Sequence, residues 1–186
     1  MSSHSGRFTP SHTTQLSFIN RPDSQFDTTV EITYQDPNGK IWVAPAGTVT
    51  DGASIPSVVA GFFGGKLNTN FLFAAIVHDA YCAEANTHLP VFQTETWQAT
   101  HQMFYHACLA NGTPSVKAKV MYAGVRLGGP RWSVGLETFN DLSAVSEAVI
   151  QEEMAYCKDW IEAQGEDLSL AEIDAWMEER EGVMLQ

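Results

Sequence analysis

A histidine–aspartate pair inside an apolar run constrains this chain more than any other feature of its sequence. Residues 71–77 are all apolar and lead directly into His78 and Asp79, after which the chain is apolar again to Cys82. Burying a carboxylate or an imidazole without a partner is costly, so the fold has to supply one. The pair therefore has either a structural role, bonding buried backbone or a polar side chain, or a chemical role in a dry site.

A second polar cluster precedes this run, at residues 50–56 with the sequence Thr-Asp-Gly-Ala-Ser-Ile-Pro. Asp51 stands on a corner where the following glycine permits an unusual backbone angle or the close approach of a ligand. Asp51 and Asp79 supply hard oxygen ligands, and His78 supplies a base that works near neutral pH. The two clusters together indicate a site that holds a cation or positions water. The simpler alternative is that Asp51 and Ser54 only cap the corner.

Length and composition fit one globular domain with an appendage. The chain has 186 residues and is 44% hydrophobic, which is enough for a sizeable core. Its longest apolar stretch falls short of the roughly 18 residues of a membrane span, and residues 1–7 lack the apolar core of a secretory signal. We therefore expect synthesis in the cytoplasm without a signal peptide. The three cysteines match no zinc or disulfide pattern and are expected to be buried, reduced thiols: Cys82, Cys108 and Cys157.

Charge divides the chain into two parts. Residues 1–136 hold eight acidic and eight basic side chains, which leaves fourteen of the 22 acidic and two of the 10 basic side chains for residues 137–186. We expect a single α+β domain over 1–136 and an acidic helical extension packed on it over 137–186. We expect no unassisted nucleic-acid binding by the extension, because phosphate contacts need cationic side chains. The extension is either a solvated acidic face or a docking surface for a basic partner.

The pattern of apolar residues predicts strands first and helices afterwards, which is typical of an α+β fold. Residues 26–34 alternate at period two, with Val30, Ile32 and Tyr34 on one face, and Asp36-Pro37-Asn38-Gly39 is a turn that leads to a returning strand at 41–43. Helical spacing then predicts five helices, the last opened by the Ser169–Glu172 capping box: 71–85, 94–111, 115–127, 142–164 and from 169 onwards.

The first two helices bring a second histidine towards the first. Helices joined by a short loop pack antiparallel, so residues equidistant from the loop midpoint near 89–90 face each other. His78 is then level with His101. His101 would orient His78 or add a nitrogen ligand, and its alternative role is that of a satisfied core histidine. The same geometry keeps Cys82 apart from Cys108.

Two further side chains have functional and structural alternatives. Cys82 lies one helical turn after His78, so the two could form a nucleophile–base pair, although two residues of one helix are poorly placed for in-line proton transfer. Arg126 ends an apolar helix, where it would either bind an anion or pair with a buried acid.

Three stretches carry a resemblance to a known family: residues 50–56, residues 74–81, which contain His78-Asp79-Ala80-Tyr81, and residues 121–128 with Arg126. Together they resemble an uncharacterised domain family of tailed bacteriophages and proteobacteria, often encoded near phage or secretion genes. The resemblance covers roughly residues 40–132. We predict that Ser54, Tyr81, Cys82 and Arg126 support the site. His101 stands where the family usually has an aspartate.

A more distant likeness is to prokaryotic phospholipase A2, which joins an Asp-Gly corner to a His-Asp-x-x-Tyr helix. The likeness implies that Asp51 and Asp79 bind a divalent cation, calcium or zinc, and that His78 activates water. His101 lies near the place of the orienting aspartate in those enzymes. The disulfides of the secreted enzymes have no counterpart here.

The leading hypothesis is a hydrolase of a bacterial envelope component, either a phospholipid ester or a peptidoglycan amide. His78 would be the general base, oriented by His101 or a carboxylate, with Asp51 and Asp79 holding the cation. Such a protein would act in phage lysis, or after delivery to the periplasm as an antibacterial effector with an immunity partner. The rivals are a non-enzymatic phage structural or assembly protein and a cysteine amidase that uses Cys82.

Overall fold

The computed structural model describes residues 6–23, 25–51, 71–134, 138–139 and 145–184. Within these ranges most of the short strands precede the helices, which confirms the predicted α+β class. The strands are β1 Arg7–Thr9, β2 Phe18–Asn20, β3 Phe26–Thr28, β4 Ile32–Gln35, β5 Ile41–Ala44, β6 Val49–Thr50, β7 Arg131–Trp132 and β8 Thr138–Phe139. The helices are α2 Leu72–Cys82, α3 Trp97–Ala110, α4 Ser115–Gly128, α5 Glu147–Gln164 and α6 Leu170–Met184.

The N-terminal strands form two small antiparallel sheets, in the orders β1-β4-β5 and β2-β3-β6. The predicted hairpin is β4–β5, in which Tyr34 is opposite Trp42. Asp36 organises its turn, because one carboxylate oxygen accepts hydrogen bonds from the amides of Asn38 and Lys40. Gly39 closes the turn with a φ of 88°, which a side chain would resist.

The prediction of one continuous strand over residues 26–34 is wrong. The chain bends at residues 29–31, so that β3 belongs to one sheet and β4 to the other. Ile32 and Tyr34 are buried as predicted, but Val30 lies at the bend with 42% of its surface exposed. Period-two alternation continues through this corner without a glycine or proline, and the pattern therefore gives no sign of the break.

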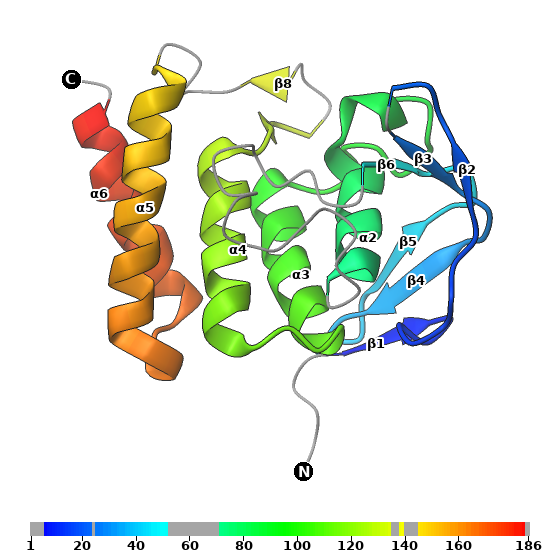
Figure 1. Ribbon diagram of the computed structural model, residues 1–186, viewed down its shortest axis with the longest axis horizontal. Helices are drawn as coiled ribbons and strands as arrows, with labels where there is room; N and C mark the ends of the chain where they lie inside the picture. Colours follow the sequence, from blue (N-terminus) through cyan, green and yellow to red (C-terminus); the bar gives the residue numbers. More distant parts are fainter. Residues whose placement is uncertain (1–5, 24, 52–70, 135–137, 140–144, 185–186) are drawn as a thin grey trace.

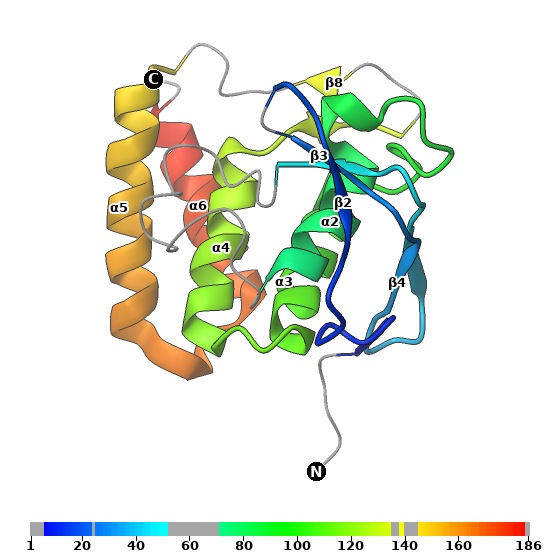
Figure 2. The same cartoon turned by 45° about the vertical axis from the view of Figure 1, so that its right-hand side comes forward.

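The helices lie side by side in the order α2, α3, α4, α5, with strands β4 and β5 beyond α2 and with α6 against α4 and α5 (Figures 1 and 2). The apolar α2 is enclosed by this arrangement, because the sheets cover one side of it and α3 the other. Residues from Phe73 to Cys82 are all buried, including His78 and Asp79. The helix that carries the titratable pair is therefore the central element of the core.

The ends of α2 differ from the prediction of a helix over 71–85. Asn68 and Asn70, which the sequence offers as caps, lie outside the described residues. The first turn is capped by the residue that follows α3, because Oδ1 of Asn111 accepts hydrogen bonds from the amides of Phe73 and Ala74. At the other end Ala83 turns to an extended conformation, and a short 3-10 turn, Glu84–Asn86, follows.

The C-terminal helices follow the predicted spacing with one exception. Met154, Cys157 and Ile161 of α5 are buried as predicted, but Val149 is 39% exposed. Residue 149 falls in the first turn of α5, which begins only after the Ser146 cap. The capping box at the start of α6 is confirmed, since Ser169 and Glu172 bond each other's backbone amides. None of the helices in the described ranges is long and apolar enough to cross a membrane.

Candidate active site

His78 and His101 face each other across the α2–α3 interface, as the equal spacing from the loop predicts. Nε2 of His78 lies 2.9 Å from Nδ1 of His101, within hydrogen-bonding distance. Both side chains are buried, and the two rings are tilted with their centroids 5.1 Å apart. One of the two nitrogens must carry the shared hydrogen, so each imidazole fixes the orientation of the other.

His101 sits in an aromatic enclosure. The ring of Trp97 lies 5.6 Å away and that of Trp132 lies 6.2 Å away, between ring centroids. Burial, reinforced by His78 and by the positive charges of Arg131 and Arg126, holds the pKa of His101 well below its usual range. The Pro130 carbonyl opposes this shift without reversing it. His101 is therefore neutral near pH 7, and it acts as a hydrogen-bonding partner of His78 rather than as a second base.

Asp79 is buried beside His78 and is held by a strand. The hydroxyl of Thr50, in β6, donates a hydrogen bond of 2.7 Å to Oδ2, and Oδ1 lies 3.9 Å from Nδ1 of His78. Burial raises the pKa of Asp79, while the neighbouring His78 imidazole and the hydrogen bond from Thr50 oppose the rise. The negative charge of Asp51 adds to the increase in the pKa of Asp79, so the two carboxyl groups act on each other electrostatically.

The described residues of the two polar clusters line one cavity of about 910 Å³. Asp51, from the end of β6, and His78, Asp79 and Cys82, from α2, all contribute to its wall. His101 lies behind His78 and is not among the described lining residues. Ser54, the remaining polar residue of the first cluster, lies outside the described residues. A solvent-excluded structural cluster would have no such cavity, so its presence favours a chemical role for His78.

Cys82 is close to His78, but its thiol is a weak nucleophile. Its Sγ lies 3.4 Å from Nδ1 of His78, and the thiol also donates to the His78 carbonyl at 3.2 Å. Burial, with the nearby Asp79, raises the pKa of Cys82 well above its usual range. The thiol is therefore protonated at neutral pH, which weakens it as a nucleophile. All three cysteines are free, as predicted.

Tyr81 and Arg126 lie away from the cavity wall that the described residues form. The Tyr81 hydroxyl accepts a hydrogen bond from the Val43 amide, and its ring packs edge-on against Trp42, so Tyr81 ties α2 to the β4–β5 sheet. A single residue separates Tyr81 from Asp79, which makes the spacing one shorter than in a His-Asp-x-x-Tyr helix. Arg126 pairs with carboxylates of α6 instead of facing the site.

Two functional neighbours escaped the sequence reasoning. Thr50 was part of the first cluster, but its bond to Asp79 depends on β6 lying beside α2. Asn86, which sequence reasoning places in a loop, is fully buried, and its amide bonds the backbone of Val49 and of Asp79. Nothing in the local pattern marks a loop asparagine as buried, because its partners are 7 and 37 residues away in the chain.

Asp51 and Asp79 are the candidate metal ligands that the sequence predicts. The described residues contain no cluster of three or more histidine, cysteine, aspartate or glutamate side chains arranged to hold an ion. Asp51 and Asp79 remain two carboxylates on one cavity whose charges repel each other. A divalent cation between them would relieve that repulsion, and their oxygen atoms suit calcium better than zinc.

Comparison with known proteins finds relatives in one bacterium. The chain is 36% identical over 121 residues to "Uncharacterized protein y4jT" of Sinorhizobium fredii (strain NBRC 101917 / NGR234), which covers 65% of this chain and 34% of that protein. It is 38% identical over 99 residues to "Uncharacterized protein y4iH" of the same strain, covering 53% of this chain and 38% of that protein. The chain thus spans little more than a third of the length of these curated relatives.

No solved structure matches the chain significantly. A family model matches residues 26–125, which include the strand that bears Thr50, the whole of α2 and the whole of α3. The residues that form the histidine pair and its cavity wall therefore lie mainly inside the matched region, whereas α5 and α6 lie outside it. The chain belongs to the family described as "Protein of unknown function (DUF1353)".

Proposed function

We propose that this protein is a hydrolase in which His78 acts as the general base. The observation that carries the proposal is the hydrogen bond of 2.9 Å between His78 and a neutral His101, with His78 on the wall of a cavity of about 910 Å³. A base needs a partner that orients it and access to substrate, and His101 and the cavity supply these two requirements.

The proposed step uses Nδ1 of His78. His78 carries its hydrogen on Nε2 and donates it to Nδ1 of His101, which leaves a lone pair on Nδ1 of His78. That nitrogen takes a proton from a water molecule in the cavity, and the resulting hydroxide attacks the carbonyl carbon of the substrate. The imidazolium then returns the proton to the leaving group. Asp79, with Oδ1 3.9 Å from Nδ1, stabilises the imidazolium while it exists.

A divalent cation, calcium in preference to zinc, is part of the proposal. Asp51 and Asp79 are the residues that would hold it, since both line the cavity and their oxygens suit a hard cation. When bound, it would supply positive charge for the negative oxygen that develops on the substrate. Independently of the ion, Thr50 keeps the Asp79 carboxyl in place through its hydrogen bond.

The proposed substrate is a component of the bacterial envelope, either a phospholipid ester or a peptidoglycan amide. Support comes from the resemblance to a domain family of phages and proteobacteria and from the phospholipase-like order of Asp51, His78 and Asp79. The setting we propose is phage lysis, or delivery to the periplasm as an antibacterial effector. An immunity or assembly partner would then dock on the acidic C-terminal helices.

The test is expression in the periplasm of a bacterium, following growth, lysis and the release of lipid and peptidoglycan fragments. We expect lysis by the wild type and by His88→Gln, whose histidine is exposed in a loop, but not by His78→Gln. Purified variants should have matching circular dichroism spectra, and activity of the purified wild type should be assayed with and without a calcium chelator. If His78→Gln hydrolyses either substrate as fast as the wild type, the proposal is wrong.

A cysteine hydrolase is the second candidate, because Sγ of Cys82 lies 3.4 Å from Nδ1 of His78, with His101 on the other side of that ring. The order nucleophile, base, orienting group is the one that cysteine hydrolases need. The raised pKa of the buried thiol opposes this mechanism. Cys82→Ala distinguishes the two mechanisms, since it removes all activity from an enzyme with a cysteine nucleophile and leaves an enzyme that uses His78 as the base active. Absence of lysis and hydrolysis with every folded variant would favour the structural or assembly role.

A further inference from the structure

Arg126 and Arg131 form a buried cationic pair at the end of α4. Their side chains are only 5% and 4% exposed, and both guanidinium groups lie over the ring of Trp97, at 5.6 and 5.0 Å from its centroid. Two buried positive charges need negative partners close by, because removing a charge from water without one is strongly unfavourable. The sequence between Glu95 and Glu137 contains no acidic residue, so α3 and α4 cannot supply them.

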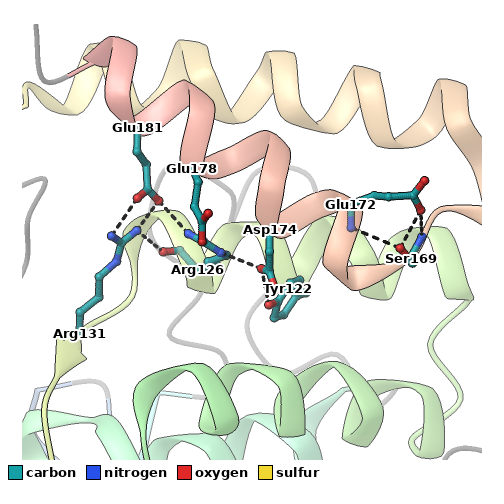
Figure 3. Close-up of polar contacts among 8 residues, drawn as sticks. All are labelled: Tyr122, Arg126, Arg131, Ser169, Glu172, Asp174, Glu178 and Glu181. Carbon is teal, nitrogen blue, oxygen red and sulfur yellow. Dashed lines mark hydrogen bonds and ion pairs between the residues drawn. The ribbon is translucent and has the colours of Figure 1, made fainter.

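The partners come from α6, the last helix of the acidic extension (Figure 3). Asp174 accepts hydrogen bonds from Nε of Arg126 at 2.8 Å and from the Tyr122 hydroxyl at 2.6 Å. Glu181 bridges the two arginines, with Nη1 of Arg126 at 2.9 Å and Nη1 of Arg131 at 3.0 Å. Glu178 adds a longer contact of 3.4 Å to Arg126 and is itself 71% exposed.

The two arginines flank a turn that belongs to the cavity. Nη2 of Arg131 donates to the Arg126 carbonyl at 2.9 Å and so fastens the chain on both sides of residues 127–130. These residues comprise the end of α4 and the bend after it, and are called the turn at 127–130 below. Gly129 and Pro130 line the cavity that also contains His78. A Cβ placed on Gly129 would lie 3.2 Å from Cε1 of His101, so the backbone of the turn rests against the histidine that orients His78.

We propose that Glu181 and Asp174 are positioning residues of the candidate active site: by holding Arg126 and Arg131 they hold the turn at 127–130 against His101 and in the cavity wall. The chain of contacts runs from Glu181 through Arg131 to the Arg126 carbonyl, and from the turn to His101. α6, which lies outside the matched family region, is in this way part of the site. The effect of these two carboxylates on catalysis rests on the proposed function, whereas their effect on the turn does not.

The alternative is that α6 stabilises the protein only as a packed helix. Ile173 and Met177 are its buried apolar residues, and they would serve such a role without any ion pair. The two explanations differ in what neutralising one carboxylate does. A packing role predicts no local effect from replacing a carboxylate with an amide of the same shape, while a positioning role predicts an effect that is confined to the turn and the His101 ring.

The experiment compares Glu181→Gln, Asp174→Asn and Glu178→Gln with Glu179→Gln, which replaces an exposed carboxylate of the same helix. Amide hydrogen exchange is measured at residues 126–132 and in α2, together with the ring ¹⁵N shifts of His101 in the intact protein. We expect exchange at the turn to rise at least about tenfold in Glu181→Gln, less in Asp174→Asn and least in Glu178→Gln. The ring shifts of His101 should move in the same order, and exchange in α2 should stay near wild type.

The control decides between local and general effects. Glu179→Gln should leave both the turn and the His101 ring unchanged, and Glu181→Asp should restore part of the protection that Glu181→Gln loses. If Glu181→Gln does not fold, the graded pair of Asp174→Asn and Glu178→Gln still tests the proposal. Unchanged exchange and shifts in every folded α6 variant would overturn it. In the hydrolase assay we expect a lower kcat with little change in KM, and failure of that assay alone would count against the proposed function and leave the positioning role intact.

Discussion

Asn86 shows how a single polar side chain joins the two halves of the site. Its Oδ1 accepts a hydrogen bond from the Val49 amide at 2.8 Å, and its Nδ2 donates to the carbonyls of Val49 and Asp79 at 2.8 and 2.9 Å. The side chain is fully buried, so these backbone groups have no water to replace it. Asn86 therefore fixes the distance between β6, which carries Thr50, and α2, which carries His78.

We expect Asn86→Ala to lower the free energy of unfolding by about 2–4 kcal/mol, because a buried donor and two buried carbonyls lose their partner. Urea denaturation followed by circular dichroism measures the change. Asn38→Ala, at an exposed position in the β4–β5 turn, is the control and should cost less than about 1 kcal/mol. A loss at Asn86 no larger than the loss at Asn38 would contradict the proposed tie between β6 and α2.

At the scale of the elements, the turn that follows α4 has little room for a side chain at Gly129. Gly129 has ordinary negative φ, so its requirement for glycine is one of space and not of backbone conformation. A Cβ at this position would lie 2.2 Å from the Val125 carbonyl oxygen as well as against His101. The backbone carbonyl cannot move without unwinding the last turn of α4, and the turn would therefore have to shift away from the cavity.

Gly129→Ala should cost about 1–3 kcal/mol of stability and should reduce hydrolysis by more than the loss of folded protein explains. Gly182→Ala is the matched control, since Gly182 lies in α6 with no atom within 4 Å of an added Cβ. We expect this control to stabilise the protein by about 0.5 kcal/mol, because alanine favours a helix more than glycine does. Thermal unfolding gives the melting temperatures of both variants. Equal melting temperatures would show that the turn tolerates a side chain.

At the scale of the whole molecule, burial of His101 links folding to pH. Its folded pKa is well below the ordinary value of 6.5, so between those two values the unfolded chain binds a proton that the folded chain does not. Stability therefore falls as pH drops below about 6.5, by up to about 1.4 kcal/mol per pH unit for one proton. Burial also lowers the pKa of His106, which acts in the same direction. Asp79, with its raised pKa, acts in the opposite direction.

The difference between the wild type and His101→Gln isolates the contribution of His101 from those of His106 and Asp79. We expect the slope of unfolding free energy against pH, measured in urea between about pH 5 and 7, to be smaller in His101→Gln by close to one proton. Parallel plots of unfolding free energy against pH for the two proteins would mean that His101 is protonated to the same extent in the folded and unfolded chains. That result would contradict the lowered pKa expected of a buried histidine.

Sequence periodicity was sufficient for the helices, the β4–β5 hairpin and one contact of the site. The α+β order, the β4–β5 hairpin and the five helices follow from local patterns of apolar residues and turn residues, because each pattern is set by neighbours a few positions apart. The meeting of His78 and His101 also follows, since two helices joined by a short loop must run antiparallel and bring equidistant residues together.

Only the tertiary structure decided which groups satisfy the buried polar atoms. Asn111 caps α2 and α6 neutralises Arg126, with partners 37 to 55 residues apart in the chain. Thr50 bonds Asp79, which is 29 residues away. The tertiary structure also decided where the chain bends between β3 and β4, which the local pattern did not indicate. Such partners leave no periodic signal, because the energy of a buried hydrogen bond or ion pair depends on the distance in space, whereas the sequence records only the distance along the chain.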